Sequence, residues 1–258
     1  MNLVFASGFL VPQAVQGHDY FRDLPQKYPS ALFATVDPLG SIAHRAVQLA
    51  AAIAAKFPAG DIHIVAHSMG GLDSRYLIAK NLNNLAARVA SLSTLSTPHW
   101  GSPVADFLTG QAAPLLLRDL AAKAMAQLFA QFPGLKNNAG ALSDLTTASA
   151  TQFNRDVPAT PGVSYYPYGA NGYGSTVLLS THLLIRLLGT SQQEQDNDGV
   201  VSVASASWPG ALVEPHWPTD HFGEIGYDLD TAGFTTPFPY LAAFDRVVAR
   251  AVASPPRN

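Results

Sequence analysis

One run of residues, Ile62–Gly71, constrains the fold of this chain more than any other feature. It reads Ile-His-Ile-Val-Ala-His-Ser-Met-Gly-Gly, so an apolar stretch typical of a buried strand meets a serine, and a helical pattern begins directly after it. A sharp strand-to-helix turn strains the serine backbone, and the residues two before and two after it must be small. Ala66 and Gly70 meet that demand. The run therefore predicts a nucleophile elbow at Ser68, in preference to a serine that only caps a helix.

Short β-prone runs alternate with helical patterns around this elbow. We expect strands at 3–7, 31–36, 62–66, 89–95 and 163–168, and helices at 41–57, 69–81, 177–188 and 244–252. Alternation of this kind implies right-handed crossovers and a mostly parallel central sheet with helices on both faces. The sequence thus predicts an α/β fold whose active site lies at the carboxyl ends of the strands.

Composition narrows the class of protein further. The 258 residues are 48% hydrophobic, which suits a single domain over 1–258, and a net charge of -3 offers no basic surface for nucleic acid. The absence of cysteine excludes disulfides, thiol nucleophiles and cysteine-bound metals. No uninterrupted apolar run reaches the roughly 18 residues of a membrane span, and we expect no secretory signal in this chain. The compartment stays undetermined.

A helical insertion is expected at about 102–140. Two Ala- and Leu-rich pieces are separated by Gly110 and Pro114 and end at Pro133-Gly134. Their apolar residues exceed what two short helices should expose: Leu115, Leu116, Leu117, Leu120, Met125, Leu128, Phe129 and Phe132. We interpret the segment as a lid over Ser68 with Gly110 and Gly134 as hinges; the alternative is an ordinary pair of core helices.

A serine hydroxyl becomes nucleophilic only with an imidazole base, and a carboxylic acid must orient that imidazole. In this fold both residues follow the serine in the sequence, first the acid and then the histidine. Asp198 precedes the β-prone residues Gly199-Val200-Val201, which is the strand end where an acid is wanted, whereas Asp196 fits a solvated turn. His221 lies after Asp198 on an irregular loop near the C-terminus. His216, among prolines, is the competing base.

The other histidines have structural interpretations. His67 adjoins the nucleophile on a turn that should direct its side chain away, His99 should brace the floor of the site, and His182 lies in a predicted helix. Three more precede the serine and break the expected order: His18, His44 and His63.

Taken together, these motifs resemble the bacterial triacylglycerol lipases of the Pseudomonas, Burkholderia and Proteus kind. The resemblance extends over nearly the whole chain and rests on several ordered segments: Gly17–Phe21, Arg45–Leu49, the elbow, Ser96–Ser102 with Ala105-Asp106, Ala141–Phe153, Val163–Tyr166, Asn197–Gly199 and Asp220-His221. It implies an α/β-hydrolase fold, a triad of Ser68, Asp198 and His221, and a lid near 102–140. It also implies that the backbone amides of Phe9 and Met69 form the oxyanion hole.

Two departures from that family matter. Its members usually carry His-Gly before the first oxyanion residue, and this chain has Ser7-Gly8. They also bind a structural calcium through two aspartates, and those positions hold Leu179 and Gly223 here. Calcium needs several oxygen ligands, so we expect the calcium site to be lost and no cofactor to be required.

The resulting prediction is a serine ester hydrolase that acts on acylglycerols or similar lipid esters, with contact to a lipid–water interface as a further possibility. The alternatives are a small-ester carboxylesterase or polyester depolymerase and, from another class, a catalytically silent binding protein of the same fold. Acyl-chain preference depends on pocket shape, which sequence patterns do not give.

Overall fold

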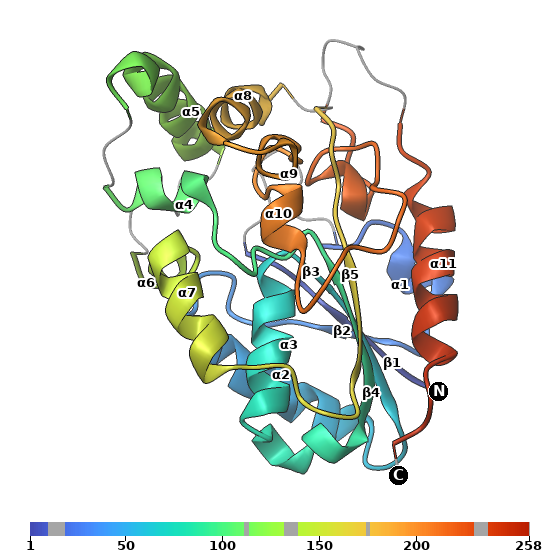
Figure 1. The fold of residues 1–258 in the computed structure, drawn as a ribbon. Helices are drawn as coiled ribbons and strands as arrows, with labels where there is room; N and C mark the ends of the chain where they lie inside the picture. The colour runs from blue at the N-terminus through green and yellow to red at the C-terminus, as the bar shows by residue number, and fades with distance from the viewer. Residues whose placement is uncertain (10–18, 111–113, 132–138, 174–175, 230–236, 258) are drawn as a thin grey trace.

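A computed structural model describes residues 1–9, 19–110, 114–131, 139–173, 176–229 and 237–257. Its centre is a five-stranded parallel sheet in the order β2-β1-β3-β4-β5 (Figure 1). The strands are β1 (Asn2–Ala6), β2 (Leu32–Ala34), β3 (Ile62–His67), β4 (Val89–Leu95) and β5 (Ser164–Tyr168). The parallel α/β architecture expected from the alternation is therefore present, and each strand lies within about two residues of its predicted span.

Helices cover both faces of this sheet. On one face α2 (Ile42–Lys56) and α3 (Met69–Ala79) pack against Val4, Ile62 and Ile64. On the other, α11 (Tyr240–Val252) and the short α1 (Leu24–Lys27) pack against Phe5 and Val65. Neighbouring residues of β1 thus enter opposite cores, as strand geometry dictates.

The remaining helices lie mostly beyond the carboxyl ends of the strands (Figure 1). They are α4 (Pro103–Leu108), α5 (Arg118–Gln131), α6 (Ala139–Asp144), α7 (Thr147–Asp156), α8 (Leu179–Leu188), α9 (Gln192–Gln195) and α10 (Val203–Ala206). Short 3-10 turns occupy Leu82–Asn84, Ala86–Arg88, Leu115–Leu117 and Gly223–Ile225. Ser41 begins α2 by accepting a hydrogen bond from the His44 amide, and this cap fixes the start that the sequence predicted.

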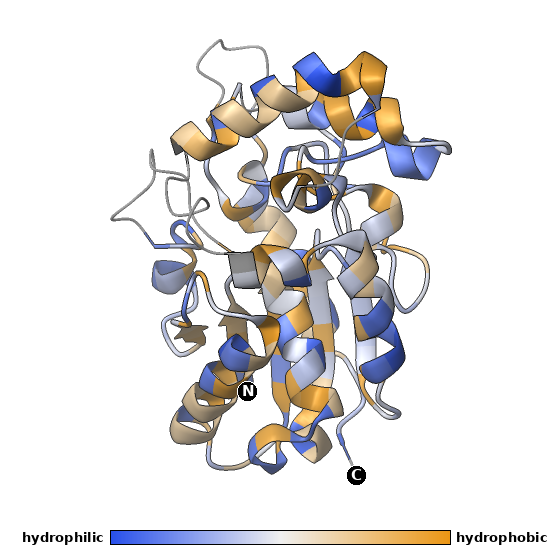
Figure 2. Ribbon diagram, turned by 90° about the vertical axis from the view of Figure 1, so that its left-hand side faces the viewer, coloured by the Kyte–Doolittle hydropathy of each residue, from blue (hydrophilic) through white to orange (hydrophobic). Residues whose placement is uncertain are grey.

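The expected lid segment is helical, and hydrophobic stretches run through the helices of this upper layer (Figure 2). α5 packs against α8, and Leu128 of α5 is buried in the core that contains Phe5 and Val65. In contrast, Leu115 and Leu116 are 75% and 95% exposed. Gly110 has a left-handed φ of 102° with open space around it, while Phe132 and Gly134 lie outside the described residues.

In the part of the chain that the structure describes, no helix has both the length and the apolar character needed to cross a membrane.

Candidate active site

Ser68 stands between β3 and α3 with φ 54° and ψ −132°, the strained conformation expected of a nucleophile elbow. Its amide donates to the Leu95 carbonyl of β4 (2.9 Å), and its carbonyl accepts from Thr97 Oγ1 (2.8 Å). A Cβ on Gly70 would lie 2.5 Å from the Ala6 carbonyl oxygen, so only glycine fits where α3 crosses the end of β1. The elbow is therefore held by hydrogen bonds to the neighbouring strand and by close backbone packing.

Asp198 and His221 meet although 23 residues separate them. The two side chains share a 2.7 Å hydrogen bond between His221 Nδ1 and Asp198 Oδ2, and the His221 amide donates to the Asp198 carbonyl. Asp198 Oδ1 accepts from the Val200 and Val201 amides. Burial by itself would raise the pKa of Asp198, but the imidazole of His221 and these hydrogen bonds outweigh it and bring that pKa to about 2. A carboxylate with that pKa orients Nδ1–H and leaves Nε2 free to accept a proton.

Ser68 and His221 open into the same cavity. The other residues that line it are apolar, apart from Ser102, whose hydroxyl donates to the Val200 carbonyl: Phe9, Pro98, Val104, Ala105, Leu108, Leu128, Leu142, Leu145, Leu178, Val200 and Phe222. Leu128 comes from α5, so the expected lid segment forms part of the wall. A cavity of this kind suits an uncharged, apolar ligand group next to a reactive hydroxyl.

The two residues proposed to form the oxyanion hole flank the nucleophile. Met69 takes the first position of α3, where a helix amide has no intrahelical acceptor, and Phe9 lines the cavity. Gly8 lies so close to the elbow that a Cβ on it would be 2.6 Å from Ser68 Cβ. Met69 thus adjoins Ser68 in the chain, and the residue before Phe9 packs against Ser68.

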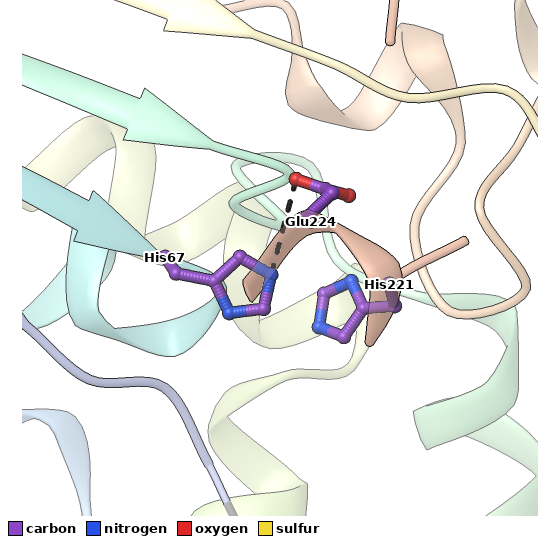
Figure 3. Close-up of side chains that lie close together, drawn as sticks. All are labelled: His67, His221 and Glu224. Atoms are coloured by element: carbon purple, nitrogen blue, oxygen red, sulfur yellow. Dashed lines mark ion pairs between the residues drawn. The ribbon is translucent and has the colours of Figure 1, made fainter. Parts of the chain in front are cut away.

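The side chain of His67 corrects one expectation. Its ring faces the site instead of pointing away from it: the rings of His67 and His221 are 4.4 Å apart, and His67 Nε2 lies 3.9 Å from Glu224 Oε2 (Figure 3). Burial lowers the pKa of His67 and raises that of Glu224, so it disfavours the charged form of both groups in this contact. The reason is that His67 ends β3, and strand alternation places it on the same face as Val65, toward α11 and the His221 loop.

Glu224 is the residue that sequence reasoning missed. It is 1% exposed, accepts a 2.6 Å hydrogen bond from Ser96 Oγ, and follows His221 by three residues. That spacing brings the two side chains into one turn, but three other acidic residues lie within eight positions of His221, and the sequence does not say which of them is buried. His67, His221 and Glu224 could offer three ligand atoms to a metal ion, although His221 is already bonded to Asp198.

The competing residues lie apart from this arrangement. His216 pairs with Glu214 at 2.9 Å, and Asp196 accepts from Gln192 at 2.7 Å. His99 is buried between Arg75 (3.0 Å) and Thr94 (3.2 Å), where it packs on Trp208. His182 is buried in α8, as the helical pattern predicted.

The family's calcium does not fit the residues found at its expected positions. Leu179 is apolar and 44% exposed, and a Cβ on Gly223 would lie 2.0 Å from Thr219 Oγ1, so no carboxylate fits there without a shift of the loop. Glu224, next along the chain, is committed to Ser96. Positions 179 and 223 therefore offer no carboxylate oxygen to a calcium ion.

Comparisons with known proteins agree with this fold. No protein-family model matches the chain. Triacylglycerol lipase 2 of Saccharomyces cerevisiae is 31% identical over 194 residues, 72% of this chain and 54% of the yeast protein. The triacylglycerol lipase of Pseudomonas fragi is 28% identical over 197 residues, 64% of this chain and 65% of that lipase. The chain thus aligns with about half to two thirds of the length of these curated relatives.

Solved structures show the same architecture. A metagenomic carboxyl esterase superposes with a TM-score of 0.70 at 19% identity, covering 98% of this chain and 75% of the esterase. The mature lipase of Bacillus licheniformis gives 0.64 at 21% identity, covering 96% and 91%. The lipase of Staphylococcus hyicus gives 0.64 at 19% identity, covering 97% and 95%.

The parallel sheet, the helices on both faces and the serine between β3 and α3 define an α/β-hydrolase. Within that class, the chain is related to the triacylglycerol lipases of the bacterial type.

Proposed function

We propose that this chain hydrolyses carboxylic esters through an acyl-enzyme, with Ser68 as nucleophile, His221 as general base and acid, and Asp198 as the orienting acid. The observation that carries the proposal is the 2.7 Å bond between His221 and Asp198 beside an apolar cavity that His221 shares with Ser68. The relatives named triacylglycerol lipase support the same chemistry.

The proposed reaction follows from the roles of these groups. His221 Nε2 takes the Ser68 proton as Oγ attacks the ester carbonyl, and the Phe9 and Met69 amides stabilise the oxyanion. Collapse of the tetrahedral intermediate breaks the ester bond, and the imidazolium gives its proton to the departing alcohol. Water then attacks the acyl-enzyme with the same base, which releases the carboxylic acid and restores Ser68.

The substrate we propose is a lipid ester, a triacylglycerol in the first place. Among the described residues the cavity wall is mostly apolar and contains no Asp, Glu, Lys or Arg. A hydrocarbon acyl chain is therefore stabilised there more than a charged group. The exposed Leu115 and Leu116, on the segment that supplies Leu128 to the cavity, favour a lid that meets a lipid surface. A small-ester carboxylesterase or polyester depolymerase would use the same triad on other substrates.

Two measurements test the proposal. A fluorophosphonate probe should label the parent chain stoichiometrically and leave Ser68→Ala unlabelled, because only an activated hydroxyl reacts. A series of p-nitrophenyl esters of increasing acyl length, assayed beside emulsified triglyceride, should show hydrolysis that increases toward medium and long chains. Absence of both labelling and hydrolysis would indicate a silent binding protein, whereas activity restricted to the shortest esters would indicate the carboxylesterase alternative.

A further inference from the structure

The loop formed by residues 7–9, here called the oxyanion loop, is held unusually close to the nucleophile elbow. A Cβ on Gly8 would lie 2.4 Å from Tyr20 Oη and 2.6 Å from Ser68 Cβ. Such distances exclude any side chain at position 8, so the backbone of Gly8 itself contacts both a tyrosine hydroxyl and the proposed nucleophile. What fixes this backbone also fixes the position of the Phe9 amide.

On one side, Gly8 is bound to Tyr20. The phenol oxygen lies against the Gly8 backbone beside its amide, and the two side-chain atoms Tyr20 Oη and His67 Nδ1 are 2.7 Å apart. Because a backbone N–H can only donate, a phenol that meets it turns its own hydrogen to His67 Nδ1. Burial raises the pKa of Tyr20 and lowers that of His67, which keeps both groups neutral and suits this direction. The chain of bonds runs from the oxyanion loop to the residue before the nucleophile.

On the other side, the oxyanion loop is bound to Arg45. Its Nη2 donates to the carbonyls of Ser7 (2.7 Å) and Gly8 (3.0 Å), and its Nε donates to Asp73 Oδ2 (2.8 Å). Arg45 has no exposed surface, and Asp73 is 1% exposed. Asp73 lies on α3, the helix that begins directly after Ser68. Arg45 therefore ties the oxyanion loop to the nucleophile helix.

Gly8 is thus enclosed from both sides: the Tyr20 hydroxyl lies against its backbone, and Arg45 binds its carbonyl. The Gly8 carbonyl and the Phe9 amide belong to one planar trans peptide unit, in which C=O and N–H point in opposite directions. A guanidinium that holds the carbonyl consequently directs the Phe9 N–H away from itself. Loss of either contact would let this peptide unit rotate.

We propose that Tyr20 and Arg45 are positioning residues that clamp Gly8 between them and thereby aim the Phe9 amide at the oxyanion of the transition state. This inference rests on the proposed function, because it assigns a role within the same ester hydrolysis. Neither side chain touches the reacting atoms; each acts through the oxyanion loop. Their contribution appears only when charge develops on the carbonyl oxygen.

The test is Tyr20→Phe, which removes one hydroxyl and keeps the ring. Loss of an oxyanion-hole donor lowers kcat by about a hundredfold to a thousandfold in serine hydrolases, so a misaligned donor should lower kcat by roughly tenfold or more. KM for a p-nitrophenyl ester should stay within about twofold, because ground-state binding depends on the apolar cavity. A trifluoromethyl ketone, whose adduct with Ser68 carries an oxyanion, should bind more weakly by the same factor as kcat falls.

Tyr28→Phe is the matched control, since it removes a tyrosine hydroxyl that donates to the exposed Asp245 of α11 (2.6 Å). It should leave kcat and the inhibition constant unchanged. Arg45→Lys is the second test variant: it keeps a cation beside Asp73 but loses the fork that reaches Gly8, and it should show the same parallel loss. Thermal midpoints are recorded for every variant that folds.

The outcomes separate the two proposals. If the parent neither reacts with a fluorophosphonate nor hydrolyses esters, the proposed function is wrong. If the parent is active and the Tyr20 and Arg45 variants that fold keep the parental kcat, or lose kcat while the ketone binds as tightly as before, the clamp is refuted. A parallel loss of kcat and ketone affinity with KM unchanged supports it, and one foldable variant of the two suffices.

Discussion

Replacing Asp198 with asparagine should reduce hydrolysis by about a thousandfold or more without unfolding the chain. Asparagine keeps an oxygen at the Oδ1 position, which accepts from the Val200 and Val201 amides, so the turn around residue 198 should persist. What changes is the partner of His221 Nδ1, at present a buried carboxylate at 2.7 Å whose pKa is about 2.

The magnitude follows from two effects. A hydrogen bond to a charged group contributes about 1.5–3 kcal/mol, which corresponds to roughly ten- to a hundredfold in rate when it stabilises the imidazolium only in the transition state. In addition, an asparagine NH₂ facing Nδ1 favours the tautomer with the hydrogen on Nε2, which cannot accept the Ser68 proton; in an unrelated serine protease the equivalent change costs about ten-thousandfold.

The assay is kcat/KM on a soluble p-nitrophenyl ester, with the thermal midpoint measured in parallel. Asp196→Asn is the matched control: this partly exposed carboxylate accepts from Gln192, whereas His221 is bonded to Asp198, so loss of the Asp196 carboxylate should change kcat/KM by less than about twofold. Asp198→Asn with more than a tenth of parental activity, or an equal loss in Asp196→Asn, would refute the assignment of the acid.

Three further predictions follow. Leu116→Asp, at a side chain that is 95% exposed, should leave the thermal midpoint and soluble-ester hydrolysis unchanged but weaken hydrolysis of emulsified triglyceride several-fold; equal loss on both substrates would contradict the lid. Excess EDTA should change neither activity nor thermal midpoint, because Leu179 and Gly223 leave the calcium positions without carboxylates; a fall that Ca²⁺ reverses would contradict this. Burial raises the pKa of Asp220 to about 6, so the native state holds this proton more tightly than the unfolded chain, and the group destabilises the fold as pH rises from about 4 to above 6. Between pH 5 and pH 8, the free energy of unfolding of Asp220→Asn should therefore rise by up to about 2 kcal/mol relative to that of the parent, as measured by chemical denaturation. A difference between variant and parent that stays the same over this pH range would refute the prediction.

Much of the fold could be predicted because its signals are local. The turn at Ser68 requires small residues two positions before and after it, and the sequence has Ala66 and Gly70 there. Apolar residues recur at the strand period before this turn and at the helix period after it. The choice of Asp198 and His221 needed the additional knowledge that acid and base follow the serine in this order. The structure brings those two side chains together; their catalytic roles stay predictions until the variants are measured.

The rest depends on contacts between distant segments. Tyr20 meets His67 across 47 residues and Ser96 meets Glu224 across 128, and no local pattern encodes either pair. The turn alone predicts a His67 side chain that points away from the site, which is wrong because His67 is the last residue of β3. Strand alternation, counted from Val65, could have placed it correctly.

The order of these segments along the chain has a consequence for biosynthesis. The elbow lies between β3 and α3 and is held by hydrogen bonds to Leu95 and Thr97, all within the first 97 residues, whereas the acid and base come from residues 198 and 221. Contacts that close so long a loop form late, because the entropy of closure opposes them until the intervening chain has folded. A nascent chain leaving the ribosome would thus carry a formed elbow without its base, and it would acquire reactivity toward esters only when its last quarter docks.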